Sequence, residues 1–191
     1  MRKPLILIAL FAFATAAFAG TVNVYYNGPA GGQYGNYFTQ PYSLTIKGVT
    51  NVLAMCDTFN REINSGDHWT ANVYNLTGGA NIGSTLFGGT LADYEQAAYI
   101  LKTYPKIPEA NAVVWDIFLP GSIELTQTGF DIQTAASKNA TMGSLTDVFA
   151  ITPTGSVGQE FLYATPEPST LLTLATGLIG LAGPARKRLF S

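Results

Sequence analysis

The chain has 191 residues, of which 12% are charged, with a single cysteine and a formal net charge of −2. A single cysteine excludes a disulfide framework within the chain, so the fold must be stabilised by the burial of apolar side chains. The length is sufficient for one domain. Residues 20–165 contain five basic residues against eleven acidic ones, because half of the Lys and Arg lie at the two ends. An acidic region without a basic patch repels phosphate backbones, so we expect no nucleic acid partner.

Residues 1–19 are typical of a secretory signal peptide. The segment begins with two basic residues and continues as an almost wholly apolar run. Small residues stand where a signal peptidase requires them, and the predicted cleavage site consists of Ala17, Ala19 and Gly20. The alternative is an uncleaved anchor helix, although the run is shorter than the ~20 residues that span a bilayer.

The middle of the chain is rich in aromatic, β-branched and glycine residues, and several runs end at turn residues as strands do. The predicted strands are Val22–Tyr26, Tyr42–Lys47, Thr50–Met55, Thr70–Tyr74, Leu145–Ile151 and Glu160–Ala164. Residues 28–37 form a glycine-rich loop that lacks the spacing of a phosphate-binding fingerprint.

Three stretches between residues 90 and 140 are predicted helices. Leu91–Thr103 has apolar residues at helical spacing after Thr90, which is placed to cap the first turn. Pro108–Phe118 begins with a proline, which the first turn of a helix tolerates. Because part of this stretch is rich in β-branched residues, a strand is the alternative prediction for that part. Asp131–Ala140 is a third, less amphipathic helix.

Strands at both ends of this region and helices between them predict an α+β fold. We expect a β-rich, sandwich-like domain with a helical insertion, flanked by an N-terminal signal helix and a C-terminal transmembrane helix. The predicted divisions are residues 1–19, residues 20–164 and residues 165–191.

The chain is poor in residues for catalysis or metal binding. Its one histidine, His68, and its one cysteine, Cys56, are compatible with a cysteine hydrolase, but no local signature of such enzymes is present. One His and one Cys do not complete a closed zinc site without carboxylates, and no calcium loop is present. We therefore expect no cofactor, no metal and no enzymatic activity.

Three motifs follow one another along the chain: "AMCDTFNREINSGDHW", "YEQAAYILKTY" and "NAVVWDIF". Over about residues 50–120 the chain resembles the thioester domains of bacterial surface proteins. The resemblance implies that the Cys56 thiol condenses with a glutamine carboxamide, giving an electrophile that acylates a target surface. Asn111 stands where those domains have the glutamine, and its side chain is one methylene shorter. Gln96 in the preceding helix is the substitute, and a buried, inert Cys56 is the other interpretation.

The C-terminal segment joins Pro166, Glu167 and Pro168 to an apolar run over residues 171–185 and then to Arg186, Lys187 and Arg188. This order resembles the PEP-CTERM sorting signal, which implies recognition and cleavage by a bacterial exosortase. The prolines favour an extended recognition segment, and the basic cluster favours a stop on the cytoplasmic side of the inner membrane. A permanent membrane anchor is the alternative.

Together these features predict an exported protein of the cell surface or the extracellular exopolysaccharide matrix, with an adhesion or matrix role and no catalysis. The expected partners are signal peptidase and exosortase during processing, the inner membrane transiently, and matrix polysaccharide. The alternatives are a covalent adhesin with a thioester at Cys56 and a cysteine hydrolase using Cys56 and His68.

Overall fold

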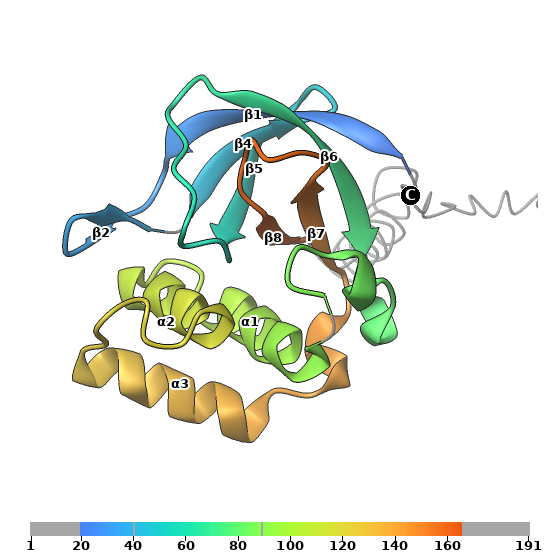
Figure 1. Ribbon diagram of the computed structural model, residues 1–191. Coiled ribbons are helices and arrows are strands. Elements are labelled where there is room, and N and C mark those ends of the chain that lie inside the picture. The colour runs from blue at the N-terminus through green and yellow to red at the C-terminus, as the bar shows by residue number, and fades with distance from the viewer. Residues whose placement is uncertain (1–19, 40, 89, 166–191) are drawn as a thin grey trace, which may run out of the picture.

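The structure is a computed structural model that describes residues 20–39, 41–88 and 90–165. A β-barrel lies above a layer of helices, and a small hairpin projects to one side (Figure 1). The predicted signal peptide and residues 166–191 of the predicted sorting segment, including its membrane helix, lie outside the described residues.

All strand pairings in the described part of the chain are antiparallel. The barrel closes in the order β1, β4, β5, β8, β7, β6, and β2 and β3 form the separate hairpin. The strands are β1 (Thr21–Pro29), β2 (Gln33–Tyr34), β3 (Tyr37–Phe38), β4 (Tyr42–Ile46), β5 (Val49–Cys56), β6 (His68–Asn75), β7 (Val148–Pro153) and β8 (Phe161–Ala164).

Alternating burial explains why these segments are strands. In β1 every second residue is buried, which matches the period of a strand with one face in a core. The turn between β4 and β5 contains Lys47 and Gly48, both with positive φ, and Ile46 pairs with Val49. A two-residue turn of this kind has the twist that an antiparallel hairpin requires.

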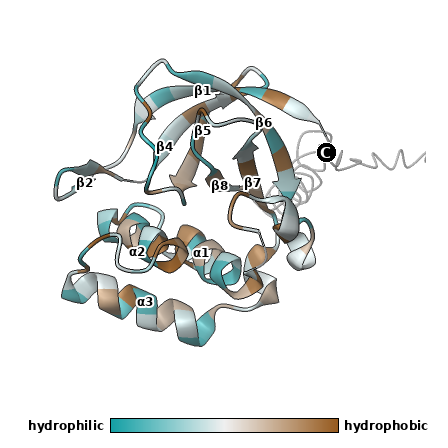
Figure 2. Ribbon diagram, viewed as in Figure 1, coloured by the Kyte–Doolittle hydropathy of each residue, from teal (hydrophilic) through white to brown (hydrophobic). Residues whose placement is uncertain are grey.

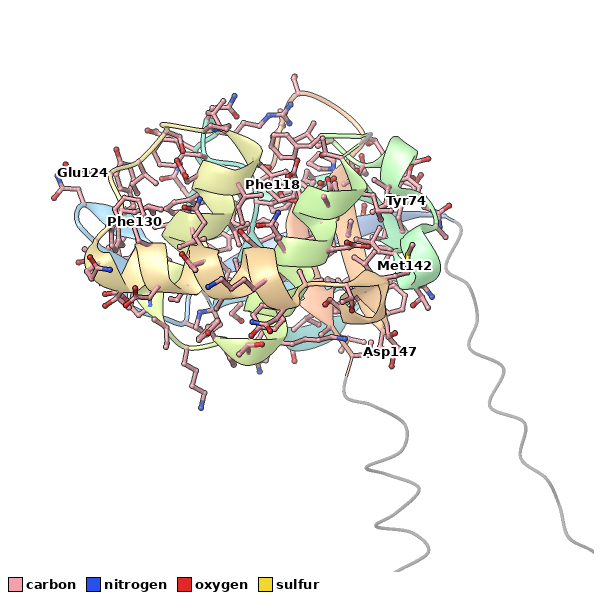
Figure 3. All side chains as sticks on the ribbon, turned by 90° about the horizontal axis from the view of Figure 1, so that it is seen from below. Tyr74, Phe118, Glu124, Phe130, Met142 and Asp147 are labelled. Carbon is pink, nitrogen blue, oxygen red and sulfur yellow. The ribbon has the colours of Figure 1, made fainter. Side chains whose placement is uncertain are left out.

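The helices of the described residues all lie between β6 and β7. They are α1 (Leu91–Thr103), α2 (Pro108–Phe118) and α3 (Gln127–Asn139), with short 3-10 turns at Thr77–Gly79, Ile82–Ser84 and Met142–Leu145. The view from below shows α3 outermost in this layer, with Phe130 toward one end and Met142 beyond the other (Figure 3).

The buried side chains form two clusters, one on each face of the strands that meet the helices. One cluster fills the barrel and includes Val24, Leu44 and Phe161. The other joins β5, β7 and β8 to the helices and includes Met55, Tyr94 and Leu162. Figure 2 shows the hydrophobic segments of the helical layer beneath the strands. Neighbouring residues of β5 and β8 therefore belong to different cores.

The α+β class and the helical insertion are confirmed, whereas the sheet is a closed barrel and not two packed sheets. The physical reason is β8, which pairs with both β5 and β7 and so joins the two halves of the sheet. Helices Leu91–Thr103 and Pro108–Phe118 have the predicted bounds. The third helix begins earlier, at Gln127, because Thr126 caps it by accepting from the Gly129 N–H at 3.3 Å.

Two local predictions were wrong. The Thr90 side chain makes no capping hydrogen bond to α1, although its main-chain carbonyl accepts from the Asp93 and Tyr94 N–H groups. Leu145 ends a 3-10 turn, and the strand begins at Val148, after Asp147 with a positive φ of 57°. Among the described residues no helix has the length and apolar character needed to cross a membrane.

Candidate functional site

Cys56 is the last residue of β5 and lies at one end of the barrel. It pairs with Phe161 at the start of β8, and the main-chain N–H of Asp57 donates to the carbonyl of Glu160 at 3.4 Å. The side chain is completely buried and belongs to the core inside the barrel. Pairing of β5 with β8 therefore places the residues before Phe161 beside the thiol.

Gln159 is the carboxamide that meets this thiol. The Cys56 Sγ lies 3.2 Å from the Gln159 Oε1, and the Gln159 side-chain N–H donates to the Arg61 carbonyl. Because a carbonyl bond is about 1.2 Å long, the Gln159 Cδ lies within about 4.4 Å of the sulfur. Sulfur and carboxamide carbon are thus close enough for a small side-chain movement to join them.

The glycine before Gln159 determines how the Gln159 side chain approaches Cys56. Gly158 has a φ of +93°, and a Cβ added there would lie 2.6 Å from the Trp69 ring. The Gly158 carbonyl accepts from the Arg61 Nη1 at 3.2 Å. Only glycine combines this backbone conformation with so close an approach to an indole, so Gly158 turns the chain and presents Gln159 to Cys56.

The surroundings of the sulfur keep it a neutral thiol. Burial raises the pKa of Cys56, and the charge of Asp57 raises it further. The Thr58 N–H, 3.3 Å from the sulfur, and the Trp115 indole lower that pKa to a smaller extent. The Trp115 Nε1 is buried and makes no well-aligned hydrogen bond, so this N–H beside the sulfur is available to a negative charge that develops there.

The two partners that sequence analysis proposed for Cys56 lie elsewhere. The Asn111 Nδ2 donates to the main-chain carbonyl of Cys56 at 3.0 Å, which ties α2 to the end of β5. The Gln96 Nε2 donates to the Ala92 carbonyl, and its Oε1 accepts from the Ser137 hydroxyl. Gln96 lines a polar hollow of about 340 Å³ between the helices, so neither carboxamide makes a polar contact with the sulfur.

Three aromatic rings cover the site on the side of α2. Tyr37, Phe59 and Trp115 pack together with ring centroids 5.1 to 6.1 Å apart. Tyr37 belongs to the projecting hairpin and is 48% exposed, so it is the outermost ring of this aromatic cap. The hairpin is tied to the helical layer through the Tyr34 hydroxyl, which donates to the Glu124 carbonyl at 2.6 Å.

Two buried carboxyl groups flank the site in sequence. Asp57 follows Cys56, Glu160 follows Gln159, and both are essentially fully buried. Glu160 accepts from the Leu86 N–H at 2.8 Å, from the Tyr94 hydroxyl at 2.6 Å and from the Thr152 hydroxyl. Burial and then the Glu160 charge raise the pKa of Asp57 well above its ordinary value.

His68 is not part of this arrangement. It lies on the exposed face of β6 and stacks on Tyr25 with ring centroids 5.5 Å apart, whereas Cys56 points into the barrel. In the described residues no group of three or more His, Cys, Asp or Glu side chains is placed to hold a metal ion. The geometry therefore offers no base for a cysteine hydrolase at His68.

Sequence reasoning missed Gln159 although the residue precedes a correctly predicted strand. The stretch "GQEFL" at residues 158–162 has a glutamine just before the strand, and this glutamine was the one local feature that could have indicated a second carboxamide candidate. What was missing was the pairing of β5 with β8, two strands that are separated in sequence by about a hundred residues. Such long-range pairing does not follow from local periodicity.

The family comparison concerns the C-terminal part of the chain. Residues 164–187 match the family model described as the PEP-CTERM protein-sorting motif. The comparison with curated proteins and the comparison with solved structures gave no significant match. The motif implies processing by an exosortase and membrane-associated sorting to the cell surface.

Proposed function

We propose that this chain, which carries the PEP-CTERM sorting motif, delivers to the cell surface a domain that closes an internal thioester between Cys56 and Gln159 and then attaches covalently to its target. The contact of 3.2 Å between the Cys56 Sγ and the Gln159 Oε1 is the observation that carries this proposal. Gln159 thereby takes the part that the family resemblance gives to a glutamine in the motif that contains Asn111.

Closure of the thioester is a condensation without any external reagent. The Cys56 sulfur attacks the Gln159 Cδ and forms the S–C bond, the C–N bond breaks, and ammonia leaves with the proton that the thiol loses. The product has the thiol ester in place of a primary amide and about 17 Da less mass. Attack by an amine on the same carbon then forms an amide and returns the thiol to Cys56.

The surroundings suit an electrophile that must survive export. Cys56 is completely buried and Gln159 is 8% exposed, so bulk water has little access to the reacting carbon. The aromatic cap lies between the site and solvent, with Tyr37 on the outside. An incoming nucleophile would approach beside Tyr37, and a primary amine on a surface protein or an amino sugar of a matrix polysaccharide is the expected class.

Such a domain is consumed by its reaction and turns over no substrate, so it would be an adhesin and not an enzyme. Cleavage of the signal peptide after Ala19, transient insertion in the inner membrane and cleavage near Pro166–Pro168 would bring it to the surface or into the exopolysaccharide matrix. Adhesion or a matrix role without a covalent bond is the competing function, and it requires no special contact between Cys56 and Gln159.

Intact-mass spectrometry of the exported full chain tests the proposal. We expect a deficit of about 17 Da against the mass calculated for the processed sequence, and a gain of about 31 Da when methylamine adds to the thioester. The matched Cys56→Ser variant should show neither change. A wild-type chain that has the calculated mass and does not react with methylamine would leave only the non-covalent role.

A further inference from the structure

The Gln159 carboxamide is held at its nitrogen as well as at its oxygen. Its Nε2 donates to the main-chain carbonyl of Arg61, while its Oε1 lies 3.2 Å from the Cys56 Sγ. A carbonyl oxygen accepts hydrogen bonds and cannot donate them, so only the nitrogen end of the carboxamide fits against Arg61. The Arg61 carbonyl therefore fixes the side of the reacting carbon on which the nitrogen lies.

Arg61 is bound to this part of the chain twice. It lies between β5 and β6, whereas Gly158 and Gln159 lie between β7 and β8. The Arg61 Nη1 donates to the Gly158 carbonyl at 3.2 Å, and the Arg61 carbonyl accepts from the next residue, Gln159. Two hydrogen bonds to consecutive residues, one of them from a charged donor, hold the Arg61 carbonyl in one position relative to the reacting carbon.

Closure of the proposed thioester removes the donor from this carbonyl. Ammonia carries the Gln159 nitrogen away, and in the part of the chain that the structure describes no other group donates to the Arg61 carbonyl. An acceptor without a donor is unfavourable where water has little access, and Gln159 is only 8% exposed. An incoming group that brings an N–H to this position is therefore bound better than one that does not.

Attack on the thioester by an amine is the reverse of closure, with the amine in place of ammonia. By microscopic reversibility the incoming nitrogen occupies the position that the Gln159 Nε2 leaves, beside the Arg61 carbonyl. The amine nitrogen forms the N–C bond to the Gln159 Cδ, the S–C bond breaks, and one amine proton passes to the Cys56 sulfur. A primary amine keeps a second N–H, which donates to the Arg61 carbonyl in the product amide.

Two other classes of nucleophile lack this N–H. A secondary amine gives a tertiary amide without an N–H, and a hydroxyl gives an ester, whose bridging oxygen faces the carbonyl as a second acceptor. We propose that Arg61 is the specificity-determining residue of the site. Its carbonyl, fixed by its own guanidinium, admits nucleophiles that keep an N–H after attack and rejects those that do not. A polysaccharide that presents hydroxyls alone is then not a target.

This inference depends on the proposed thioester, and a series of small amines tests the two separately. Ethylamine and dimethylamine have the same atoms, but only ethylamine leaves an N–H in its amide. Each is added to the exported full chain, and intact-mass spectrometry follows the gain of about 45 Da. Both rates are divided by those of a small alkyl thioester, which reports the reactivity of each amine without the protein. The corrected preference for ethylamine should exceed about 100-fold, because a site that binds an N–H strongly rejects an analogue without it.

Isopropylamine separates hydrogen bonding from size in the wild-type chain. It is bulkier than dimethylamine but is a primary amine, so after the same correction it should react at least about tenfold faster than dimethylamine. Rejection of both amines to the same extent would assign the preference to the size of the site and would overturn the role of Arg61. This comparison requires no variant, so it decides the matter even if substitution of Arg61 prevents folding.

Variants of Arg61 test the hydrogen bond that holds its carbonyl. Arg61→Met removes the donor to Gly158, so the corrected preference for ethylamine should fall at least about tenfold, whereas Arg61→Lys keeps a donor and should retain most of the preference. The matched control is Lys106→Met, which removes an exposed cation between α1 and α2 and should leave the preference unchanged. An unchanged preference in an Arg61→Met chain that closes its thioester would contradict the inference.

The outcomes separate the two claims. If the wild-type chain shows no mass deficit and adds none of these amines, the thioester and the selection by Arg61 fall together. If it adds ethylamine and dimethylamine in the same ratio as the small thioester, the thioester stands and only the role of Arg61 is overturned.

Discussion

Strand β5 joins two ends of the barrel that differ in almost every respect. At the site end, defined by Cys56, Gln159 and Trp115, polar atoms are buried and the aromatic cap excludes water. At the groove end, defined by Val49, Leu53 and Tyr163, an apolar groove of about 480 Å³ is open, and Val49 and Leu53 are 62% and 53% exposed.

The difference between the two ends shows which of them has the features of a functional site and which is ordinary protein surface. Exposed apolar side chains are common in proteins and cost little, so the groove end requires no special explanation. At the site end, the Asn111 Oδ1 is buried without a hydrogen-bond partner among the described residues, which costs about 1 to 3 kcal/mol. An arrangement that lowers stability at one end and not at the other is typical of a functional site.

The largest effect is expected from shortening Gln159. Gln159→Asn withdraws the carboxamide carbon by one methylene, so the mass deficit of the exported chain should disappear completely. The matched control is Gln96→Asn, which makes the same change in the polar hollow between the helices and should leave the deficit intact. Intact-mass spectrometry measures both. Loss of the deficit in the Gln96 variant would instead assign the carboxamide to α1.

The next effect concerns the glycine that presents Gln159. Gly158→Ala forces a side chain into a left-handed backbone position and against Trp69, so we expect the free energy of unfolding to fall by about 3 kcal/mol. Gly155→Ala is the control, because nothing lies within 4 Å of a Cβ added there. Denaturant unfolding measures both variants. Equal stability would mean that Trp69 moves aside easily and that Gly158 does not fix the approach of Gln159.

A smaller effect is expected from the pH dependence of stability. The pKa of Asp57 is raised in the folded state, so its protonated form favours folding. This contribution is fully present below about pH 4 and is lost as the pH rises through the folded-state pKa. The free energy of unfolding of the wild type should therefore decline as the pH rises above about 4, and Asp57→Asn should reduce that decline.

The Asp57→Asn comparison is made by denaturant unfolding at several pH values. Glu124→Gln serves to subtract the effect of removing one negative charge from the exposed surface. A wild-type chain and an Asp57→Asn chain with the same pH dependence would show that Asp57 is not protonated preferentially in the folded state.

The smallest effect belongs to the groove end. Val49→Thr keeps the shape of a 62%-exposed side chain, so the free energy of unfolding should change by less than about 0.5 kcal/mol. The mass deficit of the exported chain should not change either. A larger loss of stability, or loss of the deficit, would show that the two ends of β5 are coupled.

The local structure was predictable because it depends on local patterns. Helices α1 and α2 have the bounds that spacing and Pro108 predict, and most strand segments were found from β-branched and aromatic runs. Closure of the barrel was not predictable, since it depends on β8 pairing with two strands that are distant in sequence.

The same limit applied to the site. Cys56 was a candidate from the sequence, because a single cysteine in an exported chain stands out. Its carboxamide partner was sought in α1 and α2 at Gln96 and Asn111, where the sequence motifs lie, but Gln159 reaches the sulfur from the start of β8. The buried Glu160 gave no local sign of its contacts with Tyr94 and Thr152, which come from other elements.

The most direct test of the central claim is to locate the methylamine adduct by peptide mapping. The exported chain is treated with methylamine, digested, and sequenced by tandem mass spectrometry. The account predicts a single γ-methylamide, at residue 159, and a free thiol at Cys56. A methylamide at Gln96, or the absence of any methylamide in a chain whose Cys56 is unmodified, would contradict it.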